Sequence, residues 1–152
     1  MKFSKRKFVK ILGFSAFLML FPIKTLFATT KKIINPNLSK KQKNIMFNDA
    51  TERPFSSDLL NEKRKGFYHC ANCGNKLFAS TAKFDSGTGW PSFSEALPGA
   101  FKTKIDYSFG MERVEYHCAK CGAHHGHVFN DGPKESGKRF CNNGLCLIFK
   151  PE

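Results

Sequence analysis

"YHCANCG" (residues 68–74) and "YHCAKCG" (residues 116–122) are the two stretches that set the architecture of this 152-residue chain. Each holds a C-x-x-C pair, and 44 residues separate the pairs. The four cysteines are Cys70, Cys73, Cys118 and Cys121. A two-residue gap lets one tight turn aim both sulfur atoms at the same ion, and two such turns complete a closed tetrahedral zinc site. The pattern therefore predicts one structural Zn²⁺ that ties two distant β-hairpins together.

Two disulfides are the alternative for these cysteines, because an exported protein meets oxidising conditions. A disulfide within one C-x-x-C closes a small ring that is typical of redox sites and not of structural cross-links. Gly74 and Gly122, which follow the two pairs, suit the backbone turn behind a metal knuckle. Zinc is the interpretation that the pattern favours.

The rest of the sequence indicates a mainly β fold. Segments such as "GFYHCANCGNKLF", "AFKTKID" and "RFCNNGLCLIF" are short and aromatic-rich, and Gly, Pro, Asn and Asp separate them. No helical periodicity persists beyond about residue 65, so we expect antiparallel strands with long loops. Short helices are predicted before the strands, one starting near Ser39 and one around residues 54–66.

The first 30 residues have the pattern of an export signal. The basic stretch "MKFSKRKFVK" precedes thirteen uncharged residues, 11–23, which are too few for a typical membrane span and suit a signal-peptide core. The segment also resembles a twin-arginine signal with Lys5 in place of the first arginine. An amphipathic helix of the fold is the alternative, but residues 11–23 lack a polar face. We therefore expect a signal peptide or N-terminal anchor and a location in the bacterial periplasm.

The expected organisation is a signal peptide or anchor at residues 1–30, a solvated linker with the start of the first helix at 31–46, and one domain at 47–152. The net charge of +13 is concentrated at the N-terminus, where residues 1–47 carry 11 Lys and Arg and no acidic residue. The remainder holds 14 basic and 12 acidic residues and is nearly neutral. This argues against a zinc-ribbon module that binds nucleic acid, which was the non-enzymatic alternative.

Cys141, in "KRFCNNG" (residues 138–144), is the candidate nucleophile. If this stretch is extended, Arg139, Cys141 and Asn143 share one face and Phe140 lies on the other. A nearby guanidinium favours the thiolate, which matters because an ordinary thiol is mostly protonated at neutral pH. The alternative is a buried structural cysteine.

The stretch "GAHHGHVFNDG" (residues 122–132) holds three histidines beside an aspartate. Four thiolates already fill a zinc site, so these histidines are not needed as ligands. Imidazole titrates near neutral pH, which makes at least one of them a candidate general acid. His69 and His117, which precede the knuckle cysteines, are expected at the surface.

Together these segments resemble the methionine-R-sulfoxide reductase family over roughly residues 38–151. The resemblance rests on the two C-x-x-C pairs and on "TERPFSS", "KFDSGTGWPSF", "CGAHHGHVFNDGPK" and "RFCNN". It implies a small twisted antiparallel fold of two sheets packed around the active site, with the zinc on the side away from catalysis.

The resemblance also implies roles for individual residues. Cys141 matches the catalytic cysteine, and His124 and His127 match the histidines that donate the proton to the sulfoxide oxygen. Trp90 matches the aromatic residue against the substrate's methyl group. The remaining polar positions of the site are Asp131, Arg139 and Asn143. His125 has no role in the family pattern.

The implied reaction is reduction of the R epimer of methionine sulfoxide, preferably in oxidised exported proteins, through a Cys141 sulfenic acid. The implied partners are that substrate and a thioredoxin-like or other thiol reductant, with no nucleic acid, and the implied state is a monomer. A non-catalytic zinc-binding module of the same fold is the alternative.

The sequence departs from the resemblance where the enzyme must be reset. Many relatives carry a second cysteine in "SGCGWPSF", where this chain has Thr88. Cys146 is the one cysteine left after the zinc ligands and the nucleophile. We interpret it as a small buried residue, because "LCLIF" is typical of a core strand. A resolving role is the alternative, since "NNG" could turn the chain back toward Cys141.

Overall fold

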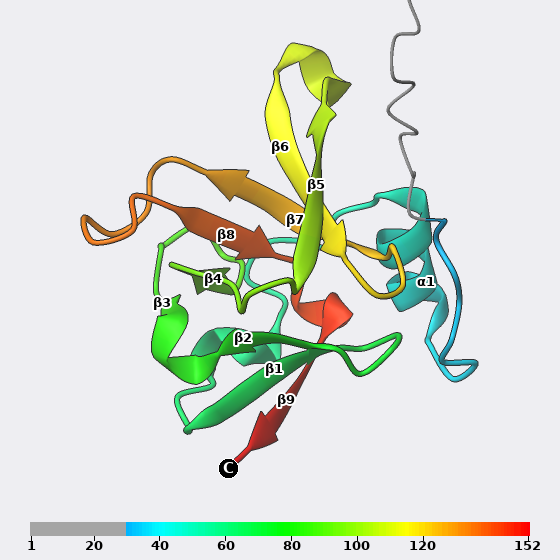
Figure 1. Ribbon diagram of the computed structural model, residues 1–152, viewed down its shortest axis with the longest axis horizontal. Coiled ribbons are helices and arrows are strands. Elements are labelled where there is room, and N and C mark those ends of the chain that lie inside the picture. Colours follow the sequence, from blue (N-terminus) through cyan, green and yellow to red (C-terminus); the bar gives the residue numbers. More distant parts are fainter. Residues whose placement is uncertain (1–29) are drawn as a thin grey trace, which may run out of the picture.

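The structure is a computed structural model that describes residues 30–152, so the predicted export signal lies outside the described residues apart from its last position. The described chain forms two antiparallel sheets and one α-helix, α1 (Lys40–Asn48), which packs beside them (Figure 1). The expected mainly β fold of two sheets is confirmed. Within residues 30–152, no helix is both long and apolar enough to cross a membrane.

The smaller sheet brings the two ends of the domain together. Its strands are β1 (Gly66–Cys70), β2 (Lys76–Ala79) and β9 (Leu147–Pro151). β1 is central and pairs antiparallel with both neighbours, in the order β2-β1-β9. The final strand of the chain therefore closes against the first.

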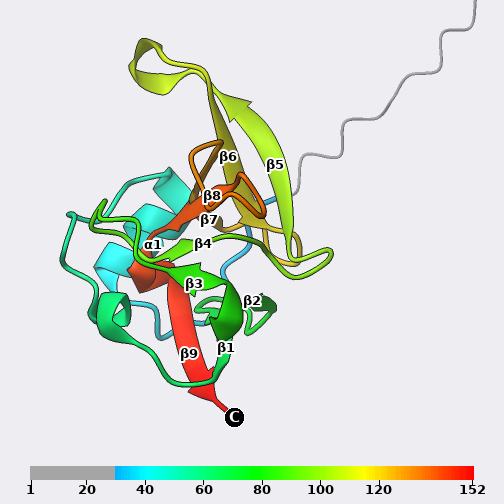
Figure 2. The ribbon, with the colours of Figure 1, turned by 90° about the vertical axis from the view of Figure 1, so that its left-hand side faces the viewer.

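The larger sheet has six strands in the order β3-β4-β8-β7-β6-β5. Its strands are β3 (Lys83–Phe84), β4 (Ser92–Phe93), β5 (Phe101–Asp106), β6 (Arg113–Cys118), β7 (His124–Phe129) and β8 (Arg139–Asn142). β8 lies between β4 and β7, so it is flanked on both sides. The β5–β6 hairpin extends well beyond the rest of the sheet (Figures 1 and 2).

Aromatic rings fill the space between the two sheets. Phe78 of β2 stacks on Phe93 of β4 with ring centroids 4.0 Å apart, and the Tyr68 ring meets the Phe93 ring edge-on at 4.9 Å. Phe140 packs against Phe78 and Tyr116 from β8, which places it on the core face as the alternation predicts. Burial of each such ring contributes about 1.5–3 kcal/mol to folding.

The first helix begins where the sequence predicts. Ser39 caps α1, because its Oγ accepts from the Gln42 N–H at 3.2 Å while the Gln42 side chain accepts from the Ser39 N–H at 3.0 Å. This reciprocal capping box satisfies two free backbone donors. Ile45 and Met46 of α1 are buried in the core.

The stretch expected to be a solvated linker is partly packed. The Lys32 N–H donates to the Cys121 carbonyl at 3.0 Å, and the Ile34 N–H donates to the Asn72 side chain at 2.8 Å. Leu38 is buried. The backbone N–H groups of this segment pair with oxygen acceptors of the two knuckles, because buried acceptors need hydrogen-bond donors.

The helix expected around residues 54–66 is only a 3₁₀ turn, η1 (Asp58–Asn61). Ser57 caps it by accepting from the Leu59 N–H at 3.2 Å. The only two leucines of the segment, Leu59 and Leu60, are adjacent, so they cannot form the apolar stripe that holds an amphipathic helix against a core.

A glycine allows the close approach of β7 and β8. A Cβ atom on Gly126 would lie 1.9 Å from the Cys141 carbonyl oxygen, so any larger residue would push the two strands apart. With glycine present, His127 of β7 stands opposite Cys141 of β8, and Ser92 of β4 stands opposite Cys141 on the other side. Cys141 therefore lies on the middle one of three paired strands, between β4 and β7.

Candidate active site and metal centre

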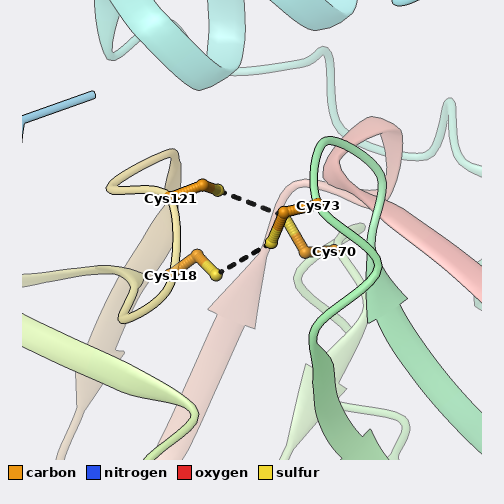
Figure 3. Close-up of side chains that lie close together, drawn as sticks. All are labelled: Cys70, Cys73, Cys118 and Cys121. Carbon is orange, nitrogen blue, oxygen red and sulfur yellow. Dashed lines mark hydrogen bonds between the residues drawn. The ribbon is translucent and has the colours of Figure 1, made fainter. Parts of the chain in front are cut away.

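The four knuckle cysteines converge at one point between the two sheets (Figure 3). The Sγ atoms of Cys70 and Cys121 are 3.8 Å apart, and those of Cys73 and Cys118 are 3.6 Å apart. All four Sγ atoms lie within 4.8 Å of one another, and none forms a disulfide. Sulfur atoms about 2.3 Å from a central zinc ion would form a tetrahedron with edges of about 3.8 Å. The residues present therefore fit one tetrahedrally held metal ion.

The two knuckles have the same backbone geometry. Gly74 and Gly122 both have φ of +71°, in the left-handed region that favours glycine. The Gly74 N–H donates to the Cys70 carbonyl, and the Gly122 N–H donates to the Cys118 carbonyl, each at 2.8 Å. One knuckle follows β1 of the smaller sheet and the other follows β6 of the larger sheet. A metal held here would clamp one sheet to the other.

Cys141 lies at a small pocket of about 130 Å³. The residues that line this pocket with it include His127, Trp90, Asn143, Thr51 and Arg113. Two strands and a loop meet at this pocket: β8 supplies the thiol, β7 supplies an imidazole, and the loop before β4 supplies the indole. A substrate group entering the pocket would contact all three.

Arg139 is held beside the thiol by an aspartate. Its Nε and Nη2 atoms donate to the two carboxylate oxygens of Asp131 at 2.9 and 2.8 Å. The guanidinium also lies near the Cys141 thiol, whose pKa it lowers, and is 4.5 Å from the centroid of the Phe129 ring. A bidentate pair of this kind fixes the orientation of the guanidinium. Asp131 therefore holds the guanidinium of Arg139 in place on β8, two residues before Cys141.

The acidity of Cys141 differs from the sequence-based expectation. Burial raises the pKa of the Cys141 thiol above its ordinary value, while Arg139 and the Thr88 side chain lower it by hydrogen bonding to the sulfur. The net shift of the Cys141 pKa is upward, because the loss of hydration destabilises the thiolate more than the guanidinium stabilises it. Local sequence could identify the neighbouring cation but not the depth of the pocket.

His127 is anchored by a carboxylate. Its Nε2 lies 2.7 Å from Asp106 Oδ2, and Arg113 Nη2 donates to the same oxygen at 2.6 Å. Burial lowers the pKa of His127 while the hydrogen bond to Asp106 raises it. The Ser108 hydrogen bonds, followed by those from His127 and Arg113, hold the pKa of Asp106 well below its usual range. The imidazole is thus fixed beside the pocket by a permanently charged partner.

His124 is almost fully buried, with 1% of its surface exposed. Its Nδ1 is 3.0 Å from Glu115 Oε1, and its Nε2 is 3.5 Å from the Asn143 side chain. The His124 and His127 ring centroids are 5.7 Å apart. The two histidines are therefore neighbours, but only His127 lines the pocket of Cys141.

The other histidines lie apart from this site. His125 is completely buried, and its ring meets the Phe101 ring edge-on at 5.4 Å. Burial lowers the pKa of His125 to about 4, so it is neutral at physiological pH. His69 and His117 are partly exposed, and neither belongs to the cysteine cluster.

Glu52 is a residue of the site that sequence reasoning missed. It connects three parts of the site by hydrogen bonds. The Trp90 indole N–H donates to the Glu52 carbonyl at 3.1 Å, and the Glu52 N–H donates to the Asn143 side chain at 3.0 Å. Its buried carboxylate accepts from the Gly144 N–H and from the Leu145 N–H at 3.1 Å. Burial raises the pKa of this carboxyl. The only sequence signal was its place in "TERPFSS", to which no role was assigned.

Tyr116 is a second missed residue. Its hydroxyl donates to the Cys141 carbonyl at 3.1 Å and to the Asn142 side chain at 2.9 Å. These contacts hold the backbone of the candidate nucleophile from the core side. As one of two tyrosines before the C-x-x-C pairs, Tyr116 was indistinguishable in sequence from Tyr68, which packs in the core.

Cys146 lies in the 3₁₀ turn η4 (Gly144–Cys146), which follows β8. It is fully buried in the hydrophobic core, and burial raises the pKa of its thiol well above the ordinary value. Its carbonyl accepts from the Ala71 N–H at 2.9 Å, inside the first knuckle. Thr88, in contrast, reaches the Cys141 sulfur with its hydroxyl and lies 2.8 Å from Ser86 Oγ.

Comparison with known proteins places the chain in a family. A family model described as "SelR domain" matches residues 38–151. A peptide methionine sulfoxide reductase MsrB of Methanosarcina barkeri is 47% identical over 123 residues, which cover 80% of this chain and 84% of that protein. The protein of the same name from Variovorax paradoxus is 57% identical, covering 66% of this chain and 75% of its own length.

A third protein of that name, from Pseudomonas entomophila, is 55% identical and covers 67% of this chain and 79% of its own length. Among solved structures, the Mis18 "Yippee-like" domain superimposes with a TM-score of 0.49 at 16% identity, covering 59% of this chain and 98% of that domain. That likeness is too slight to bear on function. The family match and the three relatives show that this chain belongs to the SelR-domain family of peptide methionine sulfoxide reductases, which are oxidoreductases.

Proposed function

We propose that this protein reduces the R epimer of methionine sulfoxide, preferably within proteins, with Cys141 as the nucleophile. The observation that carries this proposal is the pocket shared by Cys141, His127 and Trp90, which brings a thiol, an imidazole and an apolar ring to one point. The Cys141 thiolate attacks the sulfoxide sulfur and the S–O bond of the substrate breaks. The oxygen, with one added proton, transfers to the Cys141 sulfur and gives a sulfenic acid, and the bond between the two sulfur atoms breaks as methionine leaves.

The proton comes from a histidine. His127 lines the pocket, and His124 is the next imidazole behind it. Asp106 lies 2.7 Å from the His127 Nε2 and Glu115 lies 3.0 Å from the His124 Nδ1, so a carboxylate stands beside one nitrogen of each ring. Arg139 and Asn143 hold the nucleophile and its backbone during the attack.

Trp90 supports the choice of epimer. Its indole is fixed by the hydrogen bond to Glu52, so it can form a rigid apolar wall for the ε-methyl group of the substrate. With the methyl group on this wall, only one configuration at sulfur turns the oxygen toward the histidines. We assign that configuration to the R epimer, as the resemblance to methionine-R-sulfoxide reductases implies.

An assay on both epimers tests this proposal. We expect a peptide with methionine-R-sulfoxide to be reduced with a dithiol reductant and the S epimer to be left unchanged. His127→Ala and His124→Ala should each reduce the rate by about 10²–10⁴ if that residue donates the proton. Equal rates on the two epimers would contradict the Trp90 wall. Undiminished rates in both histidine variants would remove the acid role.

The cysteine cluster holds one structural Zn²⁺ per chain. Support comes from the four thiols, their tetrahedral spacing and the matched knuckles. Sulfur ligands of this number suit zinc best among common biological metals. The cluster is closed by four protein ligands, so its role is to stabilise the fold and not to take part in the reaction.

External thiols reset the enzyme. Thr88 stands beside the Cys141 sulfur, where a resolving cysteine would be needed, and Cys146 is enclosed in the core. Two thiols, from a thioredoxin-like protein or from small molecules, then reduce the sulfenic acid to a thiol with release of water and a disulfide. The enzyme acts as a monomer.

Thiol counting after one turnover tests this route. The enzyme is treated with one equivalent of substrate and no reductant, and mass spectrometry locates the oxidised cysteines. We expect a sulfenic acid on Cys141 with Cys146 still reduced, because a fully buried thiol with a raised pKa is a poor nucleophile. A Cys141–Cys146 disulfide, with thioredoxin-dependent turnover lost in Cys146→Ser, would contradict direct reduction.

The site of action is the bacterial periplasm, where the enzyme repairs oxidised exported proteins. Support comes from the basic start and the uncharged stretch of residues 1–30. A reporter fused to residues 1–32 should leave the cytoplasm, and Arg6→Lys should sharply reduce export if the twin-arginine route is used. A reporter found only in the cytoplasm would overturn this location.

A further inference from the structure

The pocket of Cys141 does not end at the thiol. It shares Trp90 with a second hollow, which is lined by Phe55, Leu60 and Phe84. The two hollows therefore lie next to each other, with Trp90 in the lining of both. The second hollow combines these apolar side chains with the polar Asn61, Lys83 and Asp85.

A third hollow continues from the pocket in another direction. It shares His127 and Arg113 with the pocket of Cys141, and Tyr107 and Phe109 of the β5–β6 hairpin line it farther out. Figures 1 and 2 show this hairpin extending beyond the body of the protein. The three neighbouring hollows share lining residues and are called the substrate cleft below; together they cover more surface than one methionine side chain needs.

Exposed aromatic rings stand along this cleft. Phe55 is 71% exposed, Tyr107 is 70% exposed and Phe109 is 88% exposed. Four of the eight large exposed hydrophobic residues among residues 30–152 belong to the β5–β6 hairpin region, and Phe55 is a fifth one that lines the cleft. Apolar groups concentrated beside a pocket mark a binding surface.

Two of these rings are displayed by unusual backbone geometry. Phe55 and Phe109 both have φ of +60°, a left-handed conformation that is strained for bulky residues. The Phe55 N–H donates to the Gly89 carbonyl at 2.8 Å, next to Trp90, and the Arg113 guanidinium lies 5.4 Å from the centroid of the Phe109 ring. Strain of this kind is retained where a displayed side chain has a function.

Resting on the function proposed above, we propose that the substrate cleft binds the polypeptide on both sides of the oxidised methionine. Phe55 and Phe109 each take an apolar side chain that flanks the sulfoxide in the substrate sequence. The hollow that Phe109 lines has no excess of basic residues, because Asp49, Asp106 and Glu115 outnumber Lys104 and Arg113, and this disfavours an anionic lipid surface as the occupant.

Paired substrates test this assignment with the full-length protein. One peptide carries leucine and phenylalanine around methionine-R-sulfoxide, a second carries serine at those positions, and the third substrate is N-acetyl-methionine-R-sulfoxide. The variants are Phe55→Asn and Phe109→Asn, because asparagine tolerates a left-handed backbone. Ile148→Asn is the matched control, since Ile148 is an exposed apolar residue of β9 in the other sheet.

Each aromatic variant should lower kcat/KM for the apolar peptide by about tenfold. Turnover of N-acetyl-methionine-R-sulfoxide and of the serine peptide should stay unchanged, as should every rate of the Ile148 variant. Unchanged rates on the apolar peptide, or equal losses on all three substrates, would overturn the cleft assignment. Binding of the wild type, but not of the variants, to anionic vesicles with no change in peptide rates would also overturn it. Failure of the wild type on all three substrates would instead contradict the proposed function.

Discussion

Replacing Cys118 with serine is expected to unfold the domain and not merely to slow it. Cys118 is fully buried, and its sulfur lies 3.6 Å from that of Cys73 in the cluster that joins the two sheets. A serine hydroxyl does not replace a thiolate ligand of zinc. Structural zinc sites contribute on the order of 10 kcal/mol in small peptides, which is comparable to the whole stability of a typical domain. The remaining contacts between the sheets cannot offset a loss of this size.

Elemental analysis and thermal unfolding measure this effect. The wild type should carry about one zinc per chain. The Cys118→Ser protein should lack the metal and the cooperative transition. Cys141→Ser is the matched control, because it makes the same atomic change at a cysteine outside the cluster and should keep both. Soluble, active wild type without metal, or a metal-free Cys118 variant with an unchanged Tm, would remove the structural role of the site.

Replacing Cys141 with serine is expected to abolish turnover while leaving the fold intact. A hydroxyl is a far weaker nucleophile than a thiolate at neutral pH, so the rate should fall by about 10⁴ or more. Serine is close in size to cysteine, and the half-buried pocket wall should accept it with little change in Tm. The side chain is not part of the cysteine cluster, so the metal content should stay that of the wild type.

Endpoint assays with a methionine-R-sulfoxide peptide and a dithiol measure the loss of turnover, and circular dichroism checks the fold. Thr88→Ser serves as the control in the same pocket, since it keeps the hydroxyl beside the Cys141 sulfur. That variant should retain most of the activity. Retention of full turnover in the Cys141 variant would favour the non-catalytic alternative or another nucleophile.

Local sequence patterns were sufficient for several features of this protein. The spacing within each C-x-x-C pair predicted one cluster of four sulfur atoms, because the chemistry of two residues on one tight turn does not depend on the rest of the fold. Alternation predicted that Phe140 packs into the core while Arg139 and Cys141 share the other face. Ser39 was predicted as the start of a helix from its capping pattern alone.

Local pattern was less reliable where burial and packing compete with propensity. The region of residues 54–66 was expected to be helical but forms one 3₁₀ turn, because no apolar stripe holds it to the core. The segment before α1 was expected to be solvated, yet its backbone bonds to both knuckles. The Arg139 effect on the Cys141 thiol was predicted correctly in sign, but burial outweighs it in the net pKa shift.

Contacts between distant parts of the chain required the folded structure. Glu52 joins Trp90 to Asn143 across 38 and 91 residues of sequence, and neither motif indicates its partner. The three histidines of "HHGH" likewise cannot be told apart in sequence. In the structure His125 is buried in the core, and the strand register places His127 opposite Cys141. Register and burial depend on how whole strands pack, so they arise from the sum of many long-range contacts. Short motifs therefore identified the chemical groups of this protein, and packing between the two sheets determined which of those groups meet.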